Sequence, residues 1–128
     1  MDNFLNDSLP IYVQIMDSVR AAIVSGELAA GQKVAPVREL AEDFGVNPNT
    51  MQRALAELER EGLLISERTA GRFVTRDLEI INKARQDAAE RIVRDFLQKM
   101  SSLGYNRTQI EEFFRTMDLM DFHQDAVI

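Results

Sequence analysis

Two short helical patterns, joined by a four-residue connection that contains one glycine, constrain the fold of this chain more than any other feature. They cover residues 37–44 and about residues 49–61, and each keeps its apolar residues on one face. Those residues are Leu40, Ala41 and Phe44 in the first pattern and Met51, Leu55 and Leu58 in the second. Gly45 suits a tight turn between the helices, and Gly62 suits the end of the second helix. The spacing predicts a helix-turn-helix, a unit that many proteins use to read DNA.

A longer helix is predicted before this pair, over residues 8–25. Ser8 is a suitable cap, and Pro10 is tolerated in the first turn. Apolar residues recur at helical spacing. The first position is Ile11 or Tyr12, and Ile15, Val19 and Ile23 follow.

Asn47, Pro48 and Asn49 form the cap region of the second short helix, because asparagine caps backbone donors well.

A β-hairpin is predicted after the helix-turn-helix. Two short β-prone runs, Leu63–Ser66 and Phe73–Thr75, flank a polar segment in which Gly71 suits a turn. Helix, helix-turn-helix and hairpin in this order form a winged helix, so the predicted class is mainly α with a small β-hairpin. Residues 8–76 are therefore the predicted DNA-binding domain.

Two further helices are predicted in residues 77–128. The first is a long amphipathic helix from about Leu78 to Met100. Asn106 and Gln109 have the spacing of a capping box for a last helix near Arg107–Leu119, and residues 121–128 are expected to fray.

The apolar faces of these two helices cannot both be buried by packing the helices against each other, which favours pairing with a second chain. Residues 77–128 are therefore a predicted dimerisation segment, whose candidate interface residues are Ile92, Phe96, Met100, Phe113, Phe114 and Met117. Filling an intrachain core is the alternative role of these side chains, and a small apolar effector is a further possible occupant. A homodimer would present two winged helices to half-sites one or more DNA turns apart, so the operator is expected to be an inverted repeat.

The candidate DNA contacts lie on the outward face of the second short helix, near the start of the first and on the predicted wing. Arg38 and Arg53 are assigned to base edges, because arginine is bidentate to guanine. Phosphates are assigned to Asn47, Asn49 and Thr50, and either kind of contact to Gln52; the predicted wing adds Arg68, Gly71 and Arg72. The alternatives are a merely solvated face, an Arg53–Glu57 ion pair, Gly71 as a turn residue only, and Lys33 as a plain surface charge.

The net charge of −6 argues against nucleic acid, but its distribution weakens that objection. Residues 31–76 carry seven basic and seven acidic side chains, so the whole deficit lies elsewhere. Without cysteine, a nucleophile–histidine pair or a phosphate loop, the sequence does not favour an enzyme, a cofactor or a metal site, and His123 stands alone. It also has no apolar run of about 18 residues and no signal-peptide pattern, so we expect a cytoplasmic protein without a membrane span.

Residues 31–62 closely resemble the signature of the GntR family of bacterial transcription regulators. Residues 38–41 (Arg-Glu-Leu-Ala), 46–50 (Val-Asn-Pro-Asn-Thr) and 58–62 (Leu-Glu-Arg-Glu-Gly) carry most of the match. The resemblance implies a transcription regulator, by analogy a repressor, and the short second segment is similar to that of the YtrA-like branch. Pro36 departs from the family by replacing a serine that would cap the next helix. A winged-helix protein-interaction module without DNA readout is the alternative function.

Overall fold

The computed structural model describes residues 9–117. The chain divides into two compact units, the first ending at Ala88 and the second starting at Ala89. The first helix, α2 (Ile11–Ser25), starts directly after Pro10, whose backbone is extended and whose carbonyl accepts from Val13 and Gln14. It therefore begins later than predicted, and Ser8 lies outside the described residues. Tyr12 is half-buried against the core and Ile11 is exposed, so Tyr12 occupies the first packed position.

The predicted helix-turn-helix is present as α3 (Val37–Phe44) and α4 (Pro48–Arg60). Gly45 ends α3 with a φ of 68°, a left-handed conformation that glycine adopts without a Cβ clash. Pro36 precedes α3 and no side chain caps that helix, in agreement with the missing serine. Phe44, expected on the buried face of α3, remains 39% exposed.

The core of the first unit lies where α2 and α3 pack against α4. Its members come from every element of this unit, and α4 contributes the most deeply buried face: Met51, Ala54, Leu55 and Leu58, all at 0% exposure. Residues from α2 that close the core include Met16, which the stripe predicted from the sequence had omitted. Because one face of α4 is completely enclosed, the rotation of this helix about its axis is fixed.

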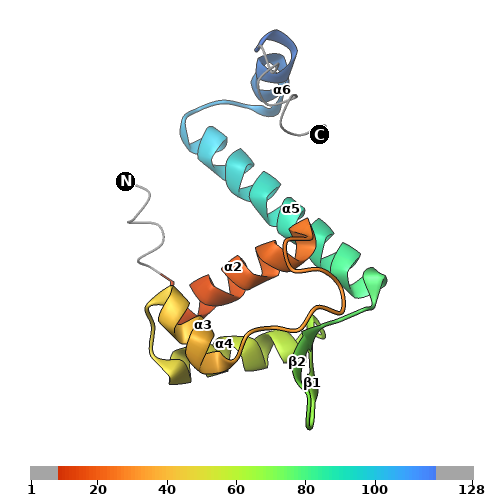
Figure 1. Cartoon of the computed structure of the whole chain (residues 1–128). Coiled ribbons are helices and arrows are strands. Elements are labelled where there is room, and N and C mark those ends of the chain that lie inside the picture. Colours follow the sequence, from red (N-terminus) through yellow and green to blue (C-terminus); the bar gives the residue numbers. More distant parts are fainter. Residues whose placement is uncertain (1–8, 118–128) are drawn as a thin grey trace. The chain divides into compact units, whose positions relative to one another are not determined.

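Strands β1 (Leu64–Glu67) and β2 (Gly71–Val74) pair in antiparallel register and form a narrow hairpin that extends away from the helices (Figure 1). β1 begins and ends one residue later than predicted, and β2 begins two residues earlier, so the turn at residues 68–70 is shorter than the polar segment that the sequence indicated. A third segment extends the sheet, since Val34 donates to the carbonyl of Arg72 and Val74 donates to that of Gln32. The wing thus consists of β1, β2 and residues 32–34.

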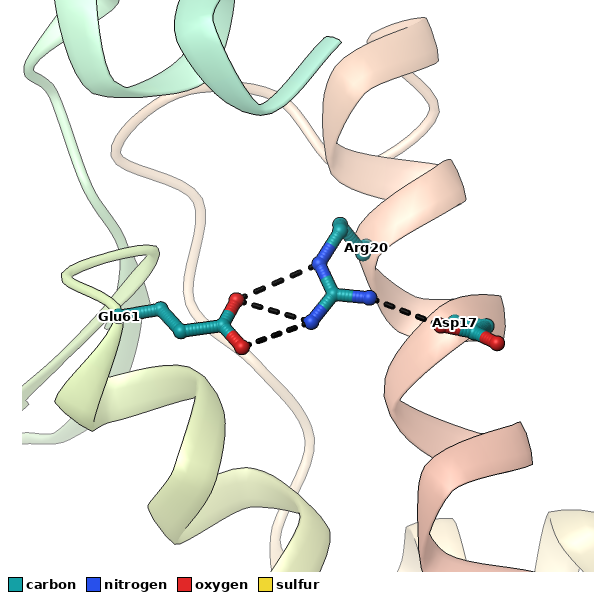
Figure 2. A network of polar contacts seen from close by, with 3 residues as sticks. All are labelled: Asp17, Arg20 and Glu61. Atoms are coloured by element: carbon teal, nitrogen blue, oxygen red, sulfur yellow. Dashed lines mark hydrogen bonds and ion pairs between the residues drawn. The ribbon is translucent and has the colours of Figure 1, made fainter. Parts of the chain in front are cut away.

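An ion-pair network joins α2 to the end of α4 (Figure 2). Both Nε and Nη2 of Arg20 donate to Glu61, the Nη2 contacts being 2.8 and 2.9 Å, and Nη1 donates to Asp17 at 2.9 Å. The Arg20 side chain is only 13% exposed, so this bidentate pair is partly shielded from solvent. It fixes the relative position of the two helices at the ends remote from Tyr12.

Helix α5 (Leu78–Ser102) begins in the first unit and continues into the second. Ile81 is buried in the core of the first unit, and Arg85 donates to the carbonyl of Val24 at 2.9 Å. The division after Ala88 therefore falls within this helix, whereas the domain boundary expected from the sequence stood at residues 76 and 77.

The second unit contains the rest of α5 and helix α6 (Arg107–Thr116). The predicted capping box is confirmed: Asn106 accepts from the Gln109 amide and Gln109 accepts from the Asn106 amide, both at 2.9 Å. Helix α6 ends before Leu119, because Met117 has an extended backbone. The tail at residues 121–128 lies outside the described residues.

Candidate nucleic-acid interface

The outward face of α4 is defined by what the opposite face buries. With Met51 and Leu55 enclosed, the helical period turns Asn49, Gln52 and Arg53 to solvent, and all three are exposed. Ala56, one turn further on, is exposed as well, and its small side chain lets another molecule approach the helix closely. The face therefore combines an amide-rich first turn with a guanidinium, the donors and acceptors that match base edges and phosphates.

Asn47 caps α4, as the sequence indicated. Its Oδ1 accepts a 2.7 Å hydrogen bond from the Asn49 amide, and Pro48 occupies the first helical position. The side-chain oxygen of Asn47 is thereby engaged in the cap, which leaves its amide group as the part available to a phosphate. Thr50, in the same first turn, is half-buried.

Arg53 stacks on an aromatic ring from another helix. Its Cζ lies 3.8 Å from the centroid of the Tyr12 ring, within the range of a cation–π contact. Glu57 instead pairs with Arg60, with Nη2 and Oε2 3.4 Å apart. The alternative Arg53–Glu57 pair is therefore not formed.

Arg38 is exposed in the first turn of α3. Within the described residues no hydrogen bond or ion pair engages its side chain. Its guanidinium thus keeps all its donors for an external partner.

The two wing arginines differ in what holds them. Arg72 is 16% exposed and its Nε donates to Oε1 of Glu59 in α4 at 2.7 Å. Burial raises the pKa of Glu59, but hydrogen bonds from Arg72 and Ser66 and the charge of Arg72 outweigh it and lower the pKa overall. Arg68 is exposed in the turn. The structure thus separates a fixed arginine, which braces the wing against α4, from a free one at its tip.

Gly71 does more than form a turn. Its φ is +107°, and a Cβ at this position would lie 3.1 Å from Cε of Lys33. Lys33 and Arg68 also line an open groove of about 590 Å³ between residues 33–37 and the hairpin. Gly71 thus lets the Lys33 side chain lie close against the wing.

Uncommitted positive charge gathers in the winged helix. Five cations of residues 31–76 have neither a carboxylate partner nor a side-chain hydrogen bond within the described residues 9–117. They are Lys33, Arg38, Arg53, Arg68 and Arg76. Five of the pairs described lie within residues 83–115 and use most of the cations there. Formal neutrality of the segment therefore understates the charge that DNA would meet.

The model of the gntR family of bacterial regulatory proteins matches residues 11–74, from the start of α2 to the end of the wing. The chain belongs to the GntR family. This member is 35% identical over 116 residues to YhcF of Bacillus subtilis, an uncharacterized HTH-type transcriptional regulator, covering 91% of this chain and 96% of YhcF. It is 40% identical over 68 residues to the repressor YtrA of the same organism, covering 53% of this chain and 52% of YtrA.

Solved structures agree with this assignment. A GntR-family transcriptional regulator from Listeria monocytogenes superposes with a TM-score of 0.78 at 38% identity, covering 88% of this chain and 98% of that one. The DNA-binding domain of AraR, solved in complex with its operator ORE1, covers 52% of this chain at 34% identity with a TM-score of 0.50. This GntR-family protein is therefore a DNA-binding transcription regulator with a winged helix, not an enzyme.

Sequence reasoning treated Tyr12 only as a packing residue and Lys33 as a surface charge. Local residue spacing could not reveal the contact of Tyr12 with Arg53, because it joins two helices that are far apart in the chain. Within residues 9–117 no cluster of three or more His, Cys, Asp or Glu side chains is placed to hold a metal ion, and His123 lies outside that range. No helix in the described range has the length and apolar character needed to cross a membrane.

Proposed function

We propose that this regulator is a repressor that binds an inverted-repeat operator as a homodimer. The observation that carries the proposal is the exposed face of α4, whose opposite face is completely buried and which therefore has one fixed outward surface. In this scheme Arg38 and Arg53 bind base edges in the major groove, and Gln52 binds a base or a phosphate. Asn47, Asn49 and Thr50 hold phosphates at the positive end of α4.

The wing supplies the remaining contacts in the same scheme. Arg68, at the exposed tip, reaches the adjacent minor groove or its phosphates. Arg72 sets the position of the wing through Glu59, and its remaining guanidinium donors face the backbone of the duplex. Gly71 allows the close approach. Repression follows when the bound protein occupies an operator that overlaps a promoter. Two relatives that carry the name of repressor, YtrA of Bacillus subtilis and the arabinose metabolism transcriptional repressor of Geobacillus stearothermophilus, support this mode.

Exposed apolar residues of the second unit support the homodimer. Phe96 and Phe114 stack with ring centroids 5.9 Å apart, and Tyr105 and Phe113 meet edge to face at 5.3 Å. These contacts are a partial intrachain core. They nevertheless leave large apolar side chains open to solvent: Ile92 at 69%, Phe114 at 58% and Met117 at 56% exposure. Covering such side chains contributes about 1.5–3 kcal/mol each, which favours a second copy of this unit as the cover.

The DNA-binding proposal is tested by selecting duplexes from a random-sequence pool with the full chain. We expect enrichment of an inverted repeat, and we expect Arg53→Ala to reduce affinity and relax the preference at one base of each half-site. Arg91→Ala is the matched control, because Arg91 is exposed and has no ion pair in the described chain. If Arg53→Ala and Arg91→Ala select the same sequences with the same affinity, the contact scheme is wrong.

The homodimer is tested by light scattering at micromolar concentration, which should report about twice 14.6 kDa. Phe114→Asp places a charge on the exposed apolar surface and should shift the protein toward the monomer. Gln98→Asp introduces the same charge at an exposed polar position of α5 and should leave the dimer intact. A wild-type monomer across this range would exclude the proposed assembly.

A further inference from the structure

Tyr12 and Arg53 form a contact between α2 and the DNA-facing surface of α4. Tyr12 is half-buried and packs against the core, so its ring is fixed by the fold. Arg53 is exposed, and its Cζ lies 3.8 Å from the ring centroid. A mobile charged side chain on the proposed DNA surface is thus held by a rigid aromatic platform.

We propose that Tyr12 is a positioning residue that orients the Arg53 guanidinium for base readout. The inference rests on the proposed contact between Arg53 and a base edge. All N–H donors of a guanidinium lie in its plane, so stacking through its face leaves them free to bind a base. The stack also removes part of the rotational freedom that an exposed arginine would otherwise lose on binding.

Other features of the structure leave this role to Tyr12. Glu57, one turn along α4 from Arg53, is engaged by Arg60. No carboxylate in residues 9–117 pairs with Arg53, so no competing acceptor pulls the guanidinium away from the ring. The bidentate Arg20–Glu61 contact holds α2 against α4 (Figure 2). Because Tyr12 lies on α2 and Arg53 on α4, this contact helps to keep the ring next to the guanidinium.

The test compares Tyr12→Phe, Tyr12→Leu and Tyr12→Met on the duplex selected by the wild-type protein. Tyr12→Phe keeps the ring and should retain both affinity and base preference. The other two variants keep apolar volume but remove the π face, and should lower affinity by about two- to fivefold per half-site. They should also relax preference at the same base that Arg53→Ala affects. Thermal unfolding establishes that each variant is folded, and if Tyr12→Leu is not, the comparison relies on Tyr12→Met.

Double variants separate positioning from a general structural effect. In the Arg53→Ala background Tyr12→Leu should have no further effect on affinity, because the residue it acts through is absent. An equal loss in both backgrounds overturns the inference while leaving the Arg53 contact intact. If Arg53→Ala itself has no effect, both the inference and the base contact fail. Loss of base preference in Tyr12→Phe would also contradict the role of the ring.

Discussion

The Arg72–Glu59 pair should be a measurable source of stability because it joins the wing to α4. Replacing Glu59 by glutamine keeps the shape of the side chain but removes the charge that Arg72 faces. Replacing Arg72 by alanine removes the other half of the pair. Glu67→Gln is the matched control, since Glu67 is exposed at the end of β1 and has no ion pair within the described residues.

The geometry sets the expected magnitude. Nε and Oε1 are 2.7 Å apart, and the side chains are 16% and 29% exposed, so the pair is neither fully solvated nor fully buried. Exposed ion pairs contribute up to about 1 kcal/mol, whereas hydrogen bonds to charged groups contribute about 1.5–3 kcal/mol. We expect a coupling free energy of about 1.5 kcal/mol between the two side chains.

The assay is a double-mutant cycle measured by urea denaturation at neutral pH. Glu59→Gln, Arg72→Ala and their combination are compared with the wild type, and Glu67→Gln should lie within about 0.5 kcal/mol of it. A coupling free energy below about 0.3 kcal/mol is ordinary additivity and would refute the inference that this pair braces the wing.

Acidification gives an independent check on the same pair. The pKa of Glu59 in the folded protein lies below its ordinary value of 4.5. The stabilisation from Glu59 is therefore fully present above pH 4.5 and is lost as the pH falls through the folded pKa. The difference in unfolding free energy between wild type and Glu59→Gln should shrink over this acidic window. A constant difference would show that the ionised carboxylate is not the stabilising species.

Three further substitutions test individual features of the first unit by thermal or urea denaturation. Asn47→Ala removes the α4 cap and should destabilise the protein by about 1 kcal/mol; an unchanged midpoint would mean that the cap hydrogen bond contributes nothing. Leu55→Ala truncates a fully enclosed side chain, leaves a cavity in its place and should lower the unfolding free energy by about 2–5 kcal/mol. A smaller loss would indicate that the surrounding core collapses into the cavity. Gly71→Ala should destabilise by about 1–3 kcal/mol through its positive φ, more than Gly26→Ala, because only Gly71 has a side chain within 4 Å of the added Cβ.

The winged helix could be predicted from the sequence because its signals are local. The residues of α3 follow the predicted bounds, and Met51, Leu55 and Leu58 are the buried stripe that their spacing indicated. Gly45 and Gly62 end their helices in left-handed conformations, as their positions suggested. Capping, periodicity and glycine placement each act within a few residues, so one sequence is enough to reveal them.

Features that depend on contacts between distant segments could not be predicted in the same way. Residues 32–34 pair with β2 and add a third segment to the sheet of the wing. These residues carry no strand pattern of their own in the sequence. Arg72 was expected among the DNA contacts, but its tie to Glu59 depends on how the hairpin folds back toward α4. The Tyr12–Arg53 contact likewise requires the packing of α2 on α4. The DNA-contact assignments and the interface residues of the second unit remain predictions.

An acidic regulator can bind an acidic polymer because local pairing, rather than net charge, determines which cations are available. Within residues 9–117, eight of the lysines and arginines form ion pairs, and five of those pairs lie within residues 83–115. Among the cations without an ion pair in residues 9–117, Arg38, Arg53 and Arg68 lie on α3, α4 and the wing. Each phosphate that such a cation neutralises releases counterions, so a protein with few of them should bind random DNA weakly and with a shallow dependence on salt. Affinity for an operator then has to come from base contacts, such as the proposed readout by Arg53, and from the two winged helices of the proposed dimer binding together.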